Sequence, residues 1–357
     1  MEKESFGAAQ FRAEYKLKEV FILKKVFAVF MALLVFVSGS FAMTPEEEEE
    51  AWKKEPAYGK VIKVGYNGGL CTGTLGITYA KGFYQAEGLN VELVRYQGDT
   101  VTLGDALGTG KIDIAGGHIA TLLVPAANGV QMKFTTGMHT GCKSLCVLAD
   151  SPYKTTKDLV GKTIAITTSI GGSDQNITMR FLLRDGIDPV RGVKYKSTDS
   201  GAAVLAMKNG EIAAALLSDQ FIQKFLEDGT LRIIRSITFD DDFKDETCCI
   251  FAVSKAICEN SPITAKKLTR AHENARKWIM ANREEAVKLM LENKWASGEF
   301  DKVLAFYNTL DYSVTDETTE ATLRKVIDDY KTCGILNSNF DTEETLARVW
   351  DGVLMEK

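Results

Sequence analysis

Four short segments combine glycine with hydroxyl, imidazole or thiol side chains at the ends of predicted strands. These segments are residues 68–74, 116–118, 139–142 and 167–173. Glycine lets the backbone approach a ligand, and the free N–H groups at the start of a helix attract anions. The chain has no Ser/His/Asp set of recognisable spacing, no phosphate loop and no zinc signature. The pattern therefore favours binding of a small molecule over catalysis, and we expect no cofactor.

Residues 68–74 join a predicted first strand to a helix and supply the hydroxyls of Thr72 and Thr74. This is the strand-end position at which α/β proteins bind ligands, although an ordinary turn with a capping threonine is the alternative. In the second segment, His118 follows Gly117 and could donate to an anion or stack on a ring. A histidine that packs locally in its loop is the alternative there.

His139 and Cys142 are three residues apart, a spacing that can chelate a metal ion. A protein metal site usually needs three or four ligands, and the chain has only three histidines. We therefore expect no metal site and interpret His139 and Thr140 as part of a polar turn beside the ligand.

Residues 167–173 carry several hydroxyls and two glycines and open a helix near Ser173. This combination suits an anionic or strongly polar group, whereas simple capping of the helix by Ser173 is the alternative. Asp219 ends another strand and could pair with a ligand ammonium or ring N–H, or cap the next helix. The candidates include no arginine, which favours a zwitterion or heterocycle over a doubly charged anion. The expected ligand-binding residues are Cys71, Thr72, Gly73, Thr74, Gly117, His118, His139, Thr140, Thr168, Ser169, Gly171, Gly172, Ser173 and Asp219.

The elements that position these residues alternate between strand and helix patterns from residue 60 to residue 234, which predicts parallel α/β sheets. After residue 260 the pattern is helical, starting at Ser261-Pro262. Two strand-like runs, at 145–149 and 249–253, enclose an α/β block. Such an inserted block predicts two hinged lobes with a ligand in the crevice between them. The expected lobes are 59–147 plus 248–357 and 148–247, with hinges at 146–149 and 248–252.

The N-terminal region has the layout of a secretory signal peptide. Lys24 and Lys25 precede an unbroken apolar run at 26–37, and the small residues Ser40 and Ala42 follow at the recognition positions. The run is shorter than the roughly 20 residues of a membrane-spanning helix, and an uncleaved anchor is the alternative. We expect a signal peptide at 1–42, an acidic leader at 43–58 and a periplasmic or extracellular protein.

All seven cysteines follow residue 42, so at least one thiol is unpaired. Cys142 and Cys146 would lie about 13 Å apart along a strand, beyond the ~7 Å limit for a disulfide, and neighbours such as Cys248 and Cys249 rarely pair. We expect no disulfide framework. The formal charge is −5 with both signs interspersed, which excludes a nucleic-acid partner.

Several segments, in this order, resemble the nitrate/sulfonate/taurine-type solute-binding proteins of ABC transporters. They are YAKGFYQAEGLNVELV at 79–94, GKIDIAGG at 110–117, DSPYKTTKDLVGKTIAI at 150–166, AMKNGEIAAALLSDQ at 206–220 and the helical stretch at 254–290. The resemblance implies a two-lobed α/β fold of the type II periplasmic-binding-protein kind, with a small ligand between the lobes. It also implies docking onto a membrane permease, and we expect a monomer. Ala213 departs from the family pattern, which has an aspartate at this structural position.

Cys248-Cys249-Ile250-Phe251 is similar to the cysteine-rich motif of fungal pyrimidine synthases of thiamine biosynthesis, which share the fold and use the cysteines with iron. Only two of the cysteines are matched, and Ile250 and Ala252 replace others. The alternative function is therefore a pyrimidine-synthase-like enzyme. Inert, buried cysteines on a hinge strand are the reading we prefer.

Overall fold

The computed structural model describes residues 43–96 and 100–355, and the chain from Trp52 onward forms one compact unit, with a boundary after Ala51. Helix α2 (Pro45–Trp52) begins with a reciprocal cap: the Thr44 N–H donates to Glu47 Oε2 at 2.9 Å, and the Glu47 N–H donates to Thr44 Oγ1 at 3.2 Å. The predicted signal peptide lies outside the described residues. Within the described ranges, no helix is long and apolar enough to cross a membrane.

Residues 52–58 are folded into this compact unit, although we expected them to belong to a solvated leader. Trp52 is buried, and its Nε1 donates to Thr264 Oγ1 at 3.0 Å. The Glu55 carboxylate accepts the N–H groups of Ile263 and Thr264 at 2.6 and 2.9 Å, at the start of helix α11 (Pro262–Ala281). A carboxylate suits this position because the first N–H groups of a helix have no partner inside it.

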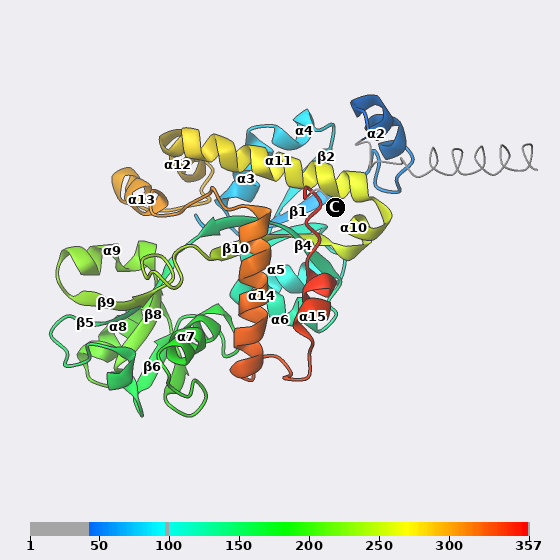
Figure 1. Cartoon of the computed structure of the whole chain (residues 1–357). Coiled ribbons are helices and arrows are strands. Elements are labelled where there is room, and N and C mark those ends of the chain that lie inside the picture. The colour runs from blue at the N-terminus through cyan, green and yellow to red at the C-terminus, as the bar shows by residue number, and fades with distance from the viewer. Residues whose placement is uncertain (1–42, 97–99, 356–357) are drawn as a thin grey trace, which may run out of the picture. The chain divides into compact units, whose positions relative to one another are not determined.

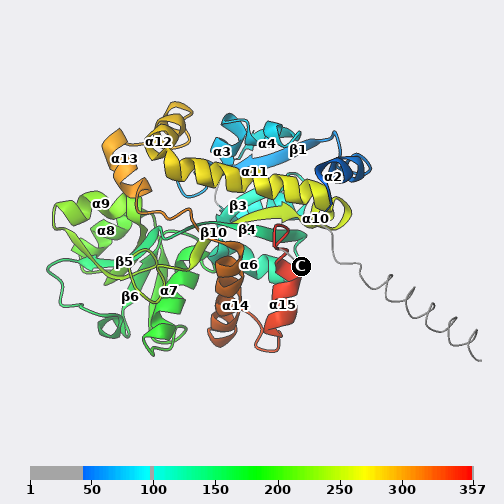
Figure 2. The same cartoon turned by 45° about the horizontal axis from the view of Figure 1, so that its top comes forward.

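The first lobe contains a five-stranded sheet of order β2-β1-β3-β10-β4 (Figures 1 and 2). Strands β1, β2 and β3 are parallel, and β10 runs antiparallel to both β3 and β4. Apolar residues such as Phe134, Ile250 and Leu323 form its core. The strands are β1 (Val61–Tyr66), β2 (Asn90–Arg95), β3 (Ile114–His118), β4 (Met132–Thr140) and β10 (Thr247–Ser254). The helices, besides α11, are α3 (Gly73–Ala80), α4 (Phe83–Ala86), α5 (Thr100–Gly108), α6 (Ile119–Ala127), α10 (Lys255–Asn260), α12 (Arg283–Glu292), α13 (Phe300–Tyr307), α14 (Asp316–Thr332) and α15 (Thr342–Val349).

The second lobe repeats this arrangement on a sheet of order β7-β6-β8-β5-β9 (Figure 1). Strands β6, β7 and β8 are parallel, and β5 runs antiparallel to β8 and β9. Its core includes Cys146, Ala165, Val204 and Leu217. The elements are β5 (Lys143–Leu148), the short 3₁₀ helix η1 (Thr156–Leu159), β6 (Thr163–Ile166), α7 (Ser173–Arg184), β7 (Lys194–Ser197), α8 (Ser200–Lys208), β8 (Ala214–Ser218), α9 (Asp219–Glu227) and β9 (Leu231–Ser236).

The chain crosses between the lobes twice, and both crossovers differ from the expected hinges. The first is at residues 141–142, between β4 of one sheet and β5 of the other. The second is the segment 237–246, between β9 and β10. The expected hinge residues 146–149 and 248–252 instead lie in or next to β5 and within β10, because each of these strands joins its sheet from its first residue. The prediction of a two-lobed α/β fold is confirmed.

Helices of the two lobes are in direct contact. Helices α6 and α14 of the first lobe pack against α7 of the second, and α13 packs against α9. Lys302 on α13 forms an ion pair with Glu227 at the end of α9, with 2.5 Å between Nζ and Oε2. The lobes are therefore closed on each other around the candidate loops.

Candidate functional site

The segment that runs from the end of β1 into the first turn of α3 contains one unpaired buried hydroxyl, that of Thr74. A Cβ on Gly73 would lie 2.2 Å from Met290 Sδ, so a larger residue there would have to displace the Met290 side chain. Thr72 Oγ1 donates to the Gly68 carbonyl at 3.1 Å and does not cap the helix. Thr74 is fully buried, and its Oγ1 has no hydrogen-bond partner among the described residues. Because buried polar groups are nearly always paired, Thr74 is the residue of this loop most open to a ligand contact.

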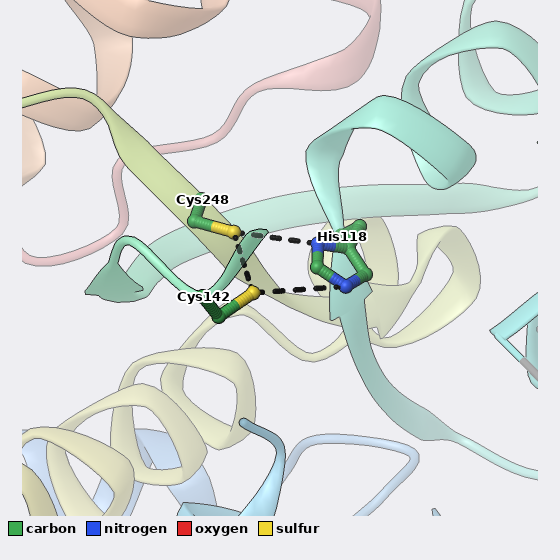
Figure 3. Close-up of side chains that lie close together, drawn as sticks. All are labelled: His118, Cys142 and Cys248. Atoms are coloured by element: carbon green, nitrogen blue, oxygen red, sulfur yellow. Dashed lines mark hydrogen bonds between the residues drawn. The ribbon is translucent and has the colours of Figure 1, made fainter. Parts of the chain in front are cut away.

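Gly117 and His118 end strand β3, next to the first turn of α6. A Cβ on Gly117 would lie 2.1 Å from Thr100 Cγ2, which explains this glycine by packing. The half-buried His118 ring faces two thiols: Nδ1 is 3.3 Å from Cys248 Sγ, and Nε2 is 3.9 Å from Cys142 Sγ (Figure 3). Burial, assisted by the nearby charge of Lys143, lowers the pKa of His118 to about 4, so the ring is neutral at neutral pH.

Cys142 occupies the first crossover in a strained backbone conformation. Its φ is +107°, a region that non-glycine residues rarely adopt and that costs about 1–3 kcal/mol. The Cys142 N–H donates to Thr238 Oγ1 at 2.7 Å, and the Cys142 carbonyl accepts the Asp219 N–H at 3.0 Å. The second crossover, through Thr238, and the second lobe, through Asp219, thus hold the two backbone polar groups. In this conformation Cys142 Sγ lies 3.4 Å from Cys248 Sγ (Figure 3).

Cys71 and His139 adjoin this pair of thiols. Interaction with the Cys142 thiol is the main cause that lowers the pKa of Cys71 well below its usual value, against the effect of burial. Burial raises the pKa of the Cys142 and Cys248 thiols well above the usual value. His139 is fully buried, and its Nδ1 lies 2.8 Å from the Thr140 carbonyl, to which it must donate. Its Nε2 has no hydrogen-bond partner in the described part of the chain.

The loop that leads into α7 uses many of its donors internally. Asp174 Oδ2 accepts the Thr167 N–H at 2.8 Å and the Thr167 hydroxyl at 2.6 Å. The Asp174 N–H donates to Thr168 Oγ1 at 3.2 Å, and the Gly171 N–H donates to Gln175 Oε1 at 2.7 Å. The protein's own Asp174 thus supplies an acceptor at the helix start where we expected an acceptor from a ligand.

Asp219 is buried and has protein partners for both carboxylate oxygens. The Ser144 hydroxyl donates to Oδ1 at 2.6 Å, and the Thr238 hydroxyl donates to Oδ2. Burial raises the pKa of Asp219 to about 6, although the two hydroxyls oppose the shift. Ser218, not Asp219, occupies the N-cap position of α9. The carboxylate therefore braces the segments around the first crossover, and its predicted contact with a cationic ligand group stays a prediction.

The two lobes are in contact at the start of α6, two residues after His118. Asn176 Nδ2 on α7 donates to the Ala120 carbonyl at 2.8 Å and to the Gly171 carbonyl at 3.1 Å. Beside this contact is a cavity of about 30 Å³, whose lining includes His118 and Cys248. A cavity of this size holds only one or two water molecules. A solute larger than this needs the lobes to separate before it can enter.

The structure gathers some of the predicted residues and disperses others. It brings His118 and Cys71 into one cluster, together with Cys142 and Cys248, which we had not included in the ligand-binding set. Residues 168–173 lie on the second lobe with partners of their own, and their ligand contacts remain predictions. Sequence reasoning missed Asn176 and Lys143. A charged residue two positions before the apolar run that starts at Leu145 was the available signal for Lys143.

Residues 55–291, about two thirds of the chain, match the sequence profile of the NMT1-like family. The chain belongs to the NMT1-like family. No curated protein sequence matches this NMT1-like chain significantly.

Solved structures share the fold of this NMT1-like chain at low sequence identity. The alkanesulfonate-binding protein SsuA from Xanthomonas axonopodis pv. citri, bound to MOPS, is similar with a TM-score of 0.64 and 17% identity, over 83% of this chain and 99% of that one. The nitrate-binding protein NrtA from Synechocystis PCC 6803 has a TM-score of 0.66 and 17% identity, over 82% and 86% of the two chains. A Candida albicans protein described as having the generic periplasmic binding protein fold has a TM-score of 0.66 and 15% identity, over 82% and 96%. These likenesses confirm the predicted fold class.

Proposed function

We propose that this chain is an extracytoplasmic solute-binding protein, which closes its lobes on a small polar or zwitterionic solute and delivers it, as a monomer, to the permease of an ABC importer. The observation that carries the proposal is the paired topology of the sheets. Each sheet contains one strand that arrives directly from the other lobe, β10 in the first and β5 in the second. Two crossovers side by side suit hinge closure around a ligand. Similar structures described as binding alkanesulfonate or nitrate support this class of solute.

The same descriptions favour binding over the pyrimidine-synthase-like alternative. The named bacterial relatives are binding proteins. The proposed role requires a bound solute that leaves unchanged. Chemical conversion of a bound pyrimidine by the purified protein would favour the enzyme instead.

A solute from the right class is expected to stabilise the protein and close it. Protein unfolded, freed of endogenous ligand and refolded should be screened by thermal shift against alkanesulfonates, taurine, nitrate and pyrimidines. At a free concentration of 100 times Kd, a solute adds about 2.7 kcal/mol of stability. The same solute should lower the radius of gyration in solution scattering. If no class shifts the melting temperature and the radius stays constant, the proposal is wrong.

Two threonine variants then locate the solute. Thr74→Val removes the unpaired buried hydroxyl and is expected to weaken binding by about 0.5–1.5 kcal/mol, roughly 2- to 12-fold in Kd. Thr78→Val is the matched control one helical turn away, because its hydroxyl already donates to the Thr74 carbonyl at 2.6 Å. Calorimetric titration in which both variants bind like wild type would place the solute elsewhere.

We further propose that the protein is exported and that residues 1–42 are removed. The support is the basic, apolar and small-residue order of that segment. Intact-mass measurement of secreted protein should then show a chain that starts at Met43. A full-length product retained in the cytoplasm would contradict export.

A further inference from the structure

Three segments that are distant in sequence bring thiol and imidazole groups together at the first crossover. His118 comes from the end of β3, Cys142 from the crossover and Cys248 from β10 (Figure 3). One ligand atom from each of the three residues lies within 4.8 Å of the others. Cys142 Sγ and Cys248 Sγ are 3.4 Å apart, and His118 Nδ1 is 3.3 Å from Cys248 Sγ.

These separations suit a tetrahedral metal ion. Zinc binds sulfur at about 2.3 Å and imidazole nitrogen at about 2.0–2.1 Å, so neighbouring ligand atoms lie about 3.6–3.8 Å apart around it. The measured distances of 3.3 and 3.4 Å differ from that range by only a few tenths of an ångström. The 3.4 Å between Cys142 Sγ and Cys248 Sγ is far longer than a disulfide bond, whose S–S length is about 2.05 Å.

A backbone irregularity in β10 increases the number of sulfurs on this side of the sheet. Consecutive side chains of a regular strand point to opposite faces. The β10–β4 pairing shifts register on both sides of Cys249, and a bulge of this kind redirects a side chain. Cys249 pairs directly with His118 across the β3–β10 ladder, and its Sγ lies 3.8 Å from His118 Nδ1. Beside this irregularity, the preceding Cys248 Sγ lies 3.3 Å from the same nitrogen. Cys71, next to Cys142, is a second neighbouring thiol, so a fourth ligand is at hand.

The cluster is held in place from both lobes. Cys142 keeps its positive φ because Thr238 of the second crossover accepts its N–H and Asp219 of the second lobe donates to its carbonyl. His118 and Cys248 are fixed by the pairing of β3 with β10, where His118 faces Cys249.

We propose that His118, Cys142 and Cys248 bind one thiophilic metal ion of the Zn²⁺ type at the junction of the lobes, with Cys249 or Cys71 as the adjacent fourth donor. This site revises our expectation that the chain holds no metal. His139, the histidine first considered, is not among the three residues whose ligand atoms lie together. The proposal is independent of which solute the protein carries.

The test uses the full chain, stripped of metal and kept reduced with a phosphine. Co²⁺ is the probe, since tetrahedral thiolate ligation produces an intense sulfur-to-cobalt charge-transfer band. We expect saturation at one Co²⁺ per chain, followed by displacement of the band on addition of Zn²⁺. Absence of the band in the reduced wild-type protein, or a spectrum without thiolate ligation, would overturn the proposal.

Serine variants assign the ligands. Cys142→Ser and Cys248→Ser should each weaken Co²⁺ binding at least about 10-fold and reduce the charge-transfer intensity. Cys258→Ser is the matched control, since Cys258 is also a buried, free cysteine but lies on α10. Circular dichroism should confirm that the variants fold. The assignment would be refuted if Cys142→Ser bound Co²⁺ as tightly as wild type. It would also be refuted if Cys258→Ser lost as much Co²⁺ affinity as the Cys142→Ser and Cys248→Ser variants.

Discussion

Replacing Lys143 with methionine is expected to lower the free energy of unfolding by about 3–5 kcal/mol, because it leaves a buried carboxylate without its cation. Lys143 Nζ lies 2.7 Å from Asp174 Oδ1, and the Asp174 side chain is 0% exposed. Methionine keeps most of the volume of the lysine side chain, so lost packing contributes little. Urea unfolding of variant and wild type measures the difference.

The pH dependence of that deficit provides an independent check. Burial alone would raise the pKa of Asp174, but Lys143 and the Thr167 hydrogen bonds outweigh it and lower the pKa below 3.8. In wild type, the stabilisation by the Asp174–Lys143 ion pair is therefore present at neutral pH. It is lost as the pH falls through the pKa of Asp174 in the folded state. Without Lys143 the largest opposing effect is gone and burial pushes the pKa of Asp174 upward, so protonation on acidification favours the folded variant. The difference in free energy of unfolding between variant and wild type should therefore become smaller as the pH falls.

Asp174→Asn added to Lys143→Met should recover part of the lost stability, because the buried charge is then gone. Lys244→Met is the control, since its pair with Asp241 is exposed and contributes little. A deficit that stays constant with pH and is not reduced in the double variant would show that Asp174 is not the cause.

Replacing Arg180 with leucine is expected to destabilise the protein by about 3 kcal/mol, near the lower end of the range for a broken buried ion pair. Arg180 on α7 of the second lobe has Nη1 2.8 Å from Glu246 Oε2 and Nε 2.8 Å from Asp329 Oδ2 on α14 of the first. The effect is limited because Arg184 also pairs with Asp329, and Lys325 with Glu246. Chemical denaturation followed by circular dichroism measures the change.

Arg324→Leu is the matched control for Arg180. Arg324 also pairs with two carboxylates, Glu320 and Glu343, but on an exposed surface of the first lobe. Its removal should change stability little, because solvent screens exposed pairs. Similar losses in both variants would mean that burial between the lobes does not set the strength of the Arg180 pairs.

The periodicity of the sequence was sufficient for most elements but not for all. A helix was predicted to open near Ser173, and α7 begins there, because its apolar spacing and its start signal are local. Strand β7 was missed: Lys194, Tyr195 and Lys196 lie at the edge of a sheet, where polar side chains meet solvent and no apolar alternation is needed. Residues 52–58 were assigned to a leader because the partners of Trp52 and Glu55 are more than 200 positions away.

The sequence by itself determined the two α/β lobes, the helical C-terminal layer and the strand-end loops, because these features depend on residues within a few positions of one another. Tertiary structure decided which side chains meet. His118 and Cys142 are 24 positions apart, and Cys248 is a further 106 from Cys142. They converge because β10 returns from the second lobe to pair with β3, with a bulge at Cys249 and a strained crossover at Cys142. No spacing rule encodes such a return, since it follows from which strands share a sheet.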